Sequence, residues 1–299
     1  MEINIDLLTR FEKRLNPTDI EASKIKARLI GYGEISSIIE LEEMPGIVFK
    51  RMPLFSNMDD AGIYRKNHDI YCSHIQENGI RLPEYEAIVV KRDEHLTTLY
   101  IAQKKLEAES IGNRYIAENP KEVVMEFFRE VILSVSKIWE FNRKNKGKIE
   151  IAIDSQISNW YKNSTLGFID TSTPLFKINN KEQLDPELLL ASAPSFGRMI
   201  IRKFFLDDVM NRYYDPKSVY TDLVANLYKE KKEEYIPGLI ELINETTDVH
   251  LSVKEIEHYY REDKFIWALF LKLRKIDRWL YKNVYKKQYQ YILPGRIER

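Results

Sequence analysis

The sequence has very little cysteine and no excess of charge of either sign. Cys72 is the single cysteine among 299 residues, which excludes an intrachain disulfide and a cysteine-rich zinc site. We expect this thiol to be buried, as free cysteines usually are. Forty-six basic residues balance 46 acidic ones, so overall charge does not indicate a nucleic-acid partner. These features predict a cytoplasmic chain.

Long apolar runs are also missing. No stretch approaches the roughly 18 consecutive apolar residues that a membrane-spanning helix needs. The charge within the first two residues is the acidic Glu2, whereas a signal peptide begins with a positively charged region. We therefore expect no membrane partner. Hydrophobic residues are 44% and charged residues 31% of the chain, which is typical of a globular protein.

The first third of the chain mixes helical and strand-like patterns. Apolar residues at helical spacing predict one helix over residues 3–15 and another over 59–78, with Gly79 as its stop. Runs of β-branched residues, interrupted by glycine and charged residues, predict five strands at 27–31, 35–41, 46–52, 85–91 and 96–103. Residues 1–103 therefore predict a small antiparallel β lobe.

The remainder reads as mostly helical. Asn119 and Pro120 supply a cap and a first-turn proline before a long amphipathic segment. Short β-like pieces at 148–153 and 167–170 surround a polar loop. Later prolines mark predicted helix starts at Pro186, Pro216 and Pro237. We predict an α+β chain, with a larger helical lobe over residues 104–299.

A glycine turn and a lysine lie on the first three predicted strands. Gly31 and Gly33 bracket a tight turn in which backbone N–H groups can approach phosphate oxygens, although an ordinary hairpin explains the pattern equally well. Lys50 follows on the third strand and would supply a positive charge to phosphates if it faces inward. Many strand lysines are simply solvated, and Arg51 must face outward if Lys50 does not.

Three oxygen-bearing side chains lie farther along the chain. Asp154 and Asn159 are in the polar loop, and Asp170 follows the second β-like piece. Two acids and an amide can position a hydroxyl and hold a divalent metal ion. The same residue types also favour turns, so their type alone leaves both interpretations open.

The order of these pieces resembles the protein-kinase-like superfamily over about residues 25–172. The segment 78–84, Asn-Gly-Ile-Arg-Leu-Pro-Glu, looks like a turn found in aminoglycoside phosphotransferases and choline kinases. An Ala-Pro-Glu signature does not follow Asp170, which also favours this small-molecule branch over protein kinases. The resemblance implies a two-lobed protein-kinase-like fold that binds ATP and Mg²⁺.

The resemblance also implies roles for individual residues on the nucleotide side. Lys50 matches the phosphate-binding lysine, and Asp69, or His68, stands where its usual glutamate partner would be. The glycine-rich loop over the phosphates would be formed by Gly31, Tyr32 and Gly33. Backbone groups near Ala102 and Gln103 would meet the adenine edge.

On the catalytic side, Asp154 matches the catalytic aspartate, while Asn159 and Asp170 match the magnesium ligands. Ala152 replaces the histidine that usually precedes the aspartate, which weakens the packing of the loop. We therefore expect an ATP- and magnesium-dependent phosphotransferase acting on a small-molecule hydroxyl. The alternative is a catalytically silent, nucleotide-binding scaffold or switch. A helical interaction module without nucleotide is a third reading.

A basic, aromatic run ends the chain. Between Lys272 and Lys287, lysines and arginines alternate with Trp279, Tyr281 and Tyr285. Such a helix could bind RNA or an acidic partner. More often its aromatics pack inward and its lysines remain in water, and this is the arrangement we expect.

Overall fold

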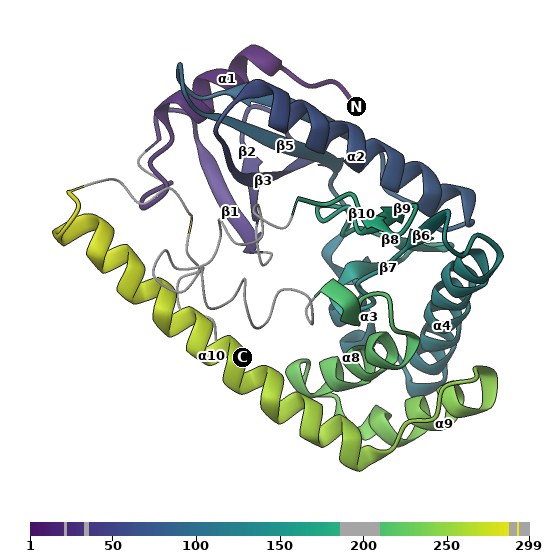
Figure 1. Cartoon of the computed structure of the whole chain (residues 1–299). Coiled ribbons are helices and arrows are strands. Elements are labelled where there is room, and N and C mark those ends of the chain that lie inside the picture. Colours follow the sequence, from purple (N-terminus) through teal and green to yellow (C-terminus); the bar gives the residue numbers. More distant parts are fainter. Residues whose placement is uncertain (21–22, 33–35, 186–209, 287–291, 293–299) are drawn as a thin grey trace.

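The chain forms an N-terminal antiparallel sheet followed by a largely helical region (Figure 1). This computed structural model describes residues 1–20, 23–32, 36–185, 210–286 and 292. The predicted α+β class is confirmed. Within these residues, no helix is both long and apolar enough to cross a membrane.

Five strands make the N-terminal sheet, in the order β1-β2-β3-β5-β4, with every neighbouring pair antiparallel. The sheet confirms all five strands predicted from the sequence. β3 runs three residues beyond its predicted end, across an irregularity in its pairing with β5 between Arg51 and Leu54. The strands are β1 (Ala27–Tyr32), β2 (Ser37–Leu41), β3 (Ile47–Phe55), β4 (Tyr85–Lys91) and β5 (Thr97–Lys104).

One amphipathic helix covers the outer face of this sheet. α1 (Ile5–Arg14) begins at Asn4, whose side chain accepts a hydrogen bond from the Leu7 amide. Its apolar side packs on the sheet, so Leu8 and Phe11 join Phe49 in a closed core. The predicted lead-in helix is therefore an integral layer of the N-terminal part.

A buried ion pair lies inside this outer core. Arg51 faces outward from the sheet, as expected, but it is 4% exposed because α1 covers it. Its guanidinium donates to both carboxylate oxygens of Glu12 at 2.8 Å, and Arg92 and Tyr100 donate to the same carboxylate. Burial alone would raise the pKa of Glu12, but Arg51 and these neighbours hold it below its usual value.

We expect Glu12→Ala to lower the free energy of unfolding by about 3–5 kcal/mol, because it leaves Arg51 buried without its carboxylate. Denaturant titration measures this. The exposed pair between Lys26 and Glu42 is the matched control, and Glu42→Ala should cost less than about 1 kcal/mol. Because the folded-state pKa of Glu12 is lowered, its contribution is complete above about pH 4.5 and falls as the pH drops through the folded-state value. Equal losses in the two variants would contradict this account.

The inner face of the sheet packs against the rest of the chain. α2 (Met58–Glu77) begins after Asn57, whose side chain accepts a hydrogen bond from the Asp60 amide. It ends before Gly79, which has a φ of +75°. A single apolar core runs from Leu99 and Ile101 on the sheet to the helical region. As expected, Cys72 is fully buried, and burial raises its pKa to about 12.

The helical region follows most of the predicted plan. Asp215 caps a helix that begins at Pro216, and Pro237 is in the first turn of the next, so both predicted starts are confirmed; Pro186 lies outside the described residues. The sequence did not predict α3 or the strands β7, β9 and β10. The helices are α3 (Gly112–Glu118), α4 (Lys121–Lys144), α8 (Pro216–Lys229), α9 (Ile236–Thr246) and α10 (Val253–Asn283). Short strands are β6 (Ile149–Ile151), β7 (Trp160–Lys162), β8 (Leu166–Phe168), β9 (Phe176–Ile178) and β10 (Lys181–Glu182).

Candidate functional site

The lysine of β3 lies on the inner face of the sheet. Lys50 pairs with Ile38 of β2 and Ile101 of β5, and Ile38 pairs in turn with Gly31 of β1. Neighbouring positions across a sheet share a face, so Lys50 points the same way as Ile101, toward the helical region. Its side chain is 6% exposed. Gly31 and Lys50 thus lie in one row across the sheet, with Ile38 between them.

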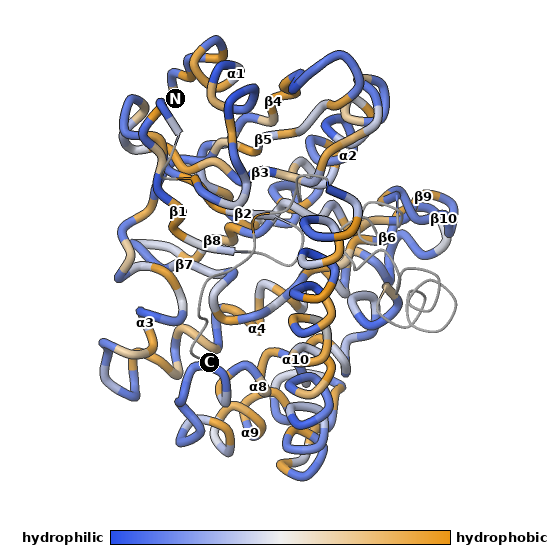
Figure 2. Tube along the Cα trace, turned by 90° about the vertical axis from the view of Figure 1, so that its left-hand side faces the viewer, coloured by the Kyte–Doolittle hydropathy of each residue, from blue (hydrophilic) through white to orange (hydrophobic). Residues whose placement is uncertain are grey.

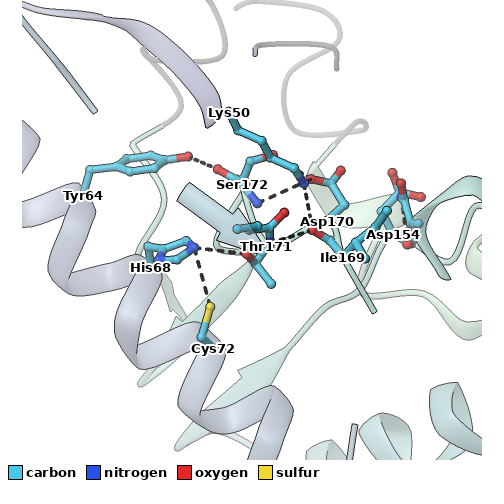
Figure 3. Close-up of polar contacts among 11 residues, drawn as sticks. Lys50, Tyr64, His68, Cys72, Asp154, Ile169, Asp170, Thr171 and Ser172 are labelled. Carbon is cyan, nitrogen blue, oxygen red and sulfur yellow. Dashed lines mark hydrogen bonds and ion pairs between the residues drawn. The ribbon is translucent and has the colours of Figure 1, made fainter. Parts of the chain in front are cut away.

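Lys50 contacts a short segment that follows β8 (Figure 3). The Lys50 Nζ atom donates to the Asp170 carboxylate at 3.0 Å and to the Ile169 carbonyl at 2.7 Å. Gln103 of β5 donates to the same carbonyl at 3.0 Å. Residues 120 positions apart therefore meet between the sheet and the helical region.

Asp170 is held as a carboxylate. Burial opposes ionisation, but the positive charge of Lys50 and the hydrogen bonds from Ser172 together keep its pKa below the usual aspartate value. The Ser172 hydroxyl lies 2.7 Å from Oδ1. The side chain remains 30% exposed, so an anionic oxygen is accessible at the edge of the site.

The buried side of α2 holds the same segment from the other direction. Tyr64 donates to the Ser172 carbonyl at 2.6 Å, and His68 Nε2 lies 3.1 Å from the Thr171 hydroxyl. Asp69, the expected partner of Lys50, is instead about half exposed, with its carboxylate 3.5 Å from His68 Nδ1. Consecutive residues on a helix lie about 100° apart, so Asp69 faces away from the site when His68 faces it. Lys50 pairs with Asp170 in its place.

The predicted catalytic loop lies beside this segment. The side-chain amide nitrogen of Asn159 donates to the backbone carbonyl of Asp154. The backbone amide of Ile169 donates to the backbone carbonyl of Asn159 at 2.8 Å. Burial, and then the charges of Cys72, Asp170 and Asp154, raise the pKa of Tyr71. Figure 3 places Asp154 beside Asp170.

Several contacts fix the backbone of this loop. Tyr71 donates to the carbonyl of Ala152 at 2.9 Å. On the opposite side, the Ser155 hydroxyl donates to Val219 and the Ile157 amide donates to the Asn226 side chain, both in α8. The loop is thus held between α2 and α8.

α3 approaches the loop so closely that its first residue must be glycine. A Cβ atom on Gly112 would lie 2.0 Å from the Ile157 carbonyl oxygen. We expect Gly112→Ala to shift the loop and to lower the free energy of unfolding by about 1–3 kcal/mol, measured by denaturant titration. Gly62→Ala in α2 is the control, because no atom lies within 4 Å there and alanine favours a helix. A neutral Gly112→Ala would mean that the loop yields without cost.

A small cavity of about 30 Å³ opens beside Asp154. Asp222 lines it and accepts a hydrogen bond from Tyr259 at 2.9 Å. Burial raises the pKa of Asp222, the charge of Asp263 adds to this, and Lys229, Tyr259 and Arg212 offset it only in part. The cavity therefore lies beside a carboxyl group whose charged form is disfavoured by burial. It is large enough for a water molecule. Other lining residues are Gln156, Arg212, Tyr213 and Ser218.

The other predicted nucleotide contacts are placed unevenly. Gly31 and Tyr32 end β1, beside Ile38 and Ser37 of β2, whereas Gly33 lies outside the described residues. Ala102 belongs to the outer core and is paired with strands on both sides, so its backbone is part of the ladder. Gln103 contributes its side chain, through Ile169, rather than its backbone.

Tyr64 and Tyr71 were not predicted to hold the site together, and His68 was considered only as a partner of Lys50. Tyr64, His68 and Tyr71 recur at helical spacing on α2, and their polar tips were a usable signal for a buried, hydrogen-bonding face. The cavity residues Asp222 and Tyr259 gave no such signal, because only folding brings them to Asp154.

Comparison with known proteins adds the family but no activity. No curated protein matches the sequence. A family model described as a family of unknown function, DUF6206, matches residues 30–278, which include the sheet, the loop and most of α10. The chain therefore belongs to the DUF6206 family.

Proposed function

We propose that this protein is an ATP- and magnesium-dependent phosphotransferase of the protein-kinase-like type, acting on a hydroxyl of a small molecule. One observation carries the proposal, namely that Lys50 of β3 meets Asp170 at 3.0 Å beside the Asp154 loop. A buried lysine next to an anionic oxygen is suited to a phosphate-bound metal ion, because the lysine neutralises phosphate while the carboxylate binds the metal.

On the nucleotide side, Lys50 would contact the phosphates, and Asp170 and Asn159 would hold magnesium. The amide nitrogen of Asn159 is committed to the Asp154 carbonyl, so its oxygen is the atom suited to a metal ion. The pKa of Asp170 lies below its usual value, which keeps it ionised and ready to bind a cation. Gly31 and Tyr32 lie at the end of the sheet where they would cover the phosphates.

On the acceptor side, Asp154 would orient the hydroxyl. The acceptor oxygen forms a bond to the γ-phosphorus as the bond to the bridging oxygen of ADP breaks, and the proton passes late to Asp154. The water-sized cavity lined by Asp154, Asp222 and Tyr259 adjoins this carboxyl group. Such a reaction depends on positioning more than on covalent chemistry.

The silent-binder alternative rests on Ala152, which lacks the histidine that stabilises related loops. Here Tyr71 donates to the Ala152 carbonyl, and α8 fixes Ser155 and Ile157. These contacts supply the rigidity that the histidine would give, so the enzyme is the better-supported proposal.

A calorimetric titration of ATP with and without magnesium tests the proposal. We expect saturable binding that requires magnesium, because the ion links the phosphates to Asp170 and Asn159. GTP is titrated in parallel, since the structure does not select the base. If both nucleotides fail to bind at millimolar concentration with magnesium, the enzyme and the silent-binder proposals are both wrong.

A further inference from the structure

The long helix α10 has two dissimilar parts. Up to Asp263 it is docked on α8, where Tyr260 stacks on Tyr228 with ring centroids 4.7 Å apart and Asp263 pairs with Lys229 at 3.0 Å. From Lys264 onward the helix runs along one side of the molecule (Figure 2). This second part is the basic, aromatic run that the proposed phosphotransferase does not use.

Apolar side chains form an exposed stripe on this second part. Phe265 is 70% exposed and Trp279 58%, and the stripe is completed by Leu269 and Ile276 at 45% and 43%. The expectation that the aromatics of the run from Lys272 to Lys287 pack inward is therefore wrong for Trp279 and for Tyr285, which is 53% exposed. Arg274 and Asp277 are instead the buried members, at 5% and 1%, because they lie on the opposite side of the helix.

The spacing of the stripe is that of a helix-packing seam. Phe265, Leu269, Lys272, Ile276 and Trp279 are separated by four, three, four and three residues, which is the heptad pattern of a coiled coil. The stripe extends for about 20 Å at 1.5 Å per residue, or two heptads. Ile266, 51% exposed, widens it on one side. A surface of this shape fits another helix.

Positive charge accompanies the stripe. Residues 264–286 contain seven basic residues and one acidic residue, Asp277, which is buried. Exposed Lys275 and Lys282 lie seven residues apart along one edge, where a coiled coil carries its pairing charges, and exposed Lys272 lies within the stripe itself. A partner must therefore offer acidic groups both beside its apolar seam and opposite Lys272.

We propose that the stripe of α10, residues 265–279, docks an amphipathic helix of a partner protein whose apolar seam is flanked by glutamate or aspartate. A second copy of this chain would place one lysine edge against another. A nucleic acid would leave the aliphatic Leu269 and Ile276 against a charged backbone. A membrane surface would bury Lys272 in the middle of the apolar face, at a cost in free energy. An acidic amphipathic helix would cover the apolar stripe and pair with Lys272, Lys275 and Lys282.

The probe for this site is a synthetic helical peptide with leucine at the seam positions, except for one glutamate placed to face Lys272, and with glutamate at the flanking positions, labelled for fluorescence anisotropy. A matched peptide carries lysine at the flanking positions. We expect the full chain to bind the acidic peptide and not the basic one. The double variant Lys275→Glu/Lys282→Glu should lose at least about tenfold in affinity for the acidic peptide and gain affinity for the basic one.

Two further variants separate charge from packing. Phe265→Ala/Trp279→Ala should weaken binding of the acidic peptide by at least about tenfold while leaving the salt dependence of the remaining affinity unchanged. Lys254→Glu is the control for the single edge variant Lys275→Glu, because this exposed lysine lies in the docked part of α10 and makes the same charge change away from the stripe. Circular dichroism verifies that each variant keeps its helix content.

The proposal is overturned if the wild-type chain does not bind the acidic peptide, or if Lys254→Glu weakens binding as much as Lys275→Glu does. Vesicles of anionic phospholipid and sedimentation of the chain alone are run in parallel. Binding to the vesicles but not to the peptide would identify a lipid surface instead, and self-association abolished by Phe265→Ala/Trp279→Ala would identify a second copy. Neither result depends on nucleotide binding, so the phosphotransferase proposal is tested separately.

Discussion

Asp154→Asn is expected to reduce phosphoryl transfer by roughly 100- to 10,000-fold, the usual contribution of a positioned general base. The ATP dissociation constant should stay within about threefold of wild type, because Asp154 would contact the acceptor rather than the triphosphate. Slow ATP hydrolysis is the assay, since water can replace an unidentified acceptor at a low rate. Asparagine keeps the side-chain oxygen that accepts from the Gln156 amide, so the loop should keep its shape.

Asp222→Asn is the companion variant for this measurement, because Asp222 lines the same cavity and accepts from Tyr259. It should leave ATP hydrolysis near wild type, since it would touch neither the nucleotide nor the attacking oxygen. If wild type and Asp154→Asn hydrolyse ATP equally while ATP binds, and an acceptor screen finds no substrate, the silent-binder alternative replaces the enzyme.

Asp170→Asn is expected to weaken magnesium-dependent ATP binding by about 10- to 100-fold, the effect of losing one charged contact to the ion. Lys50→Met should weaken it by a similar factor through the lost phosphate contact. The two variants differ without magnesium, where Lys50→Met should still reduce the residual affinity and Asp170→Asn should not. Calorimetric titration with and without magnesium measures all four cases.

Each of these variants also breaks the Lys50–Asp170 pair, so stability must be measured beside binding. The control is Lys162→Met, which breaks the contact of Lys162 with Glu130 in the helical region without touching the site. If all three variants lose ATP affinity in proportion to their lost stability, the pair is a structural contact and the nucleotide proposal is wrong.

Much of the fold could be predicted from the sequence because its signals are local. Runs of β-branched residues, and stops such as Gly79, depend on neighbouring residues, and all five strands of the sheet lie on such runs. The short strands β7, β9 and β10 were not predicted, because two or three residues are too few to show a strand pattern. The orientation of α10 was predicted wrongly, since its aromatic residues gave no indication of which face the rest of the chain covers.

The site was predictable in its types of residue but not in its pairings. Lys50, Asp154, Asn159 and Asp170 could be chosen by order and spacing. The partner of Lys50 could not, because Asp69 and His68 are adjacent in sequence, whereas the rotation of α2 decides which of them faces the site. Tyr71, from a different element, holds the carbonyl of Ala152, and a contact of that kind leaves no mark in the sequence near Ala152.

The segment 169–172 belongs to the helical region by sequence, yet side chains of the N-terminal part hold it. Lys50 and Gln103 bind the carbonyl of Ile169, and Tyr64 binds that of Ser172. Separating the two parts would therefore expose all of these groups at once. A ligand that orders this segment would stabilise the sheet and the helical region together, so its binding free energy would be spread over the whole chain rather than over one half.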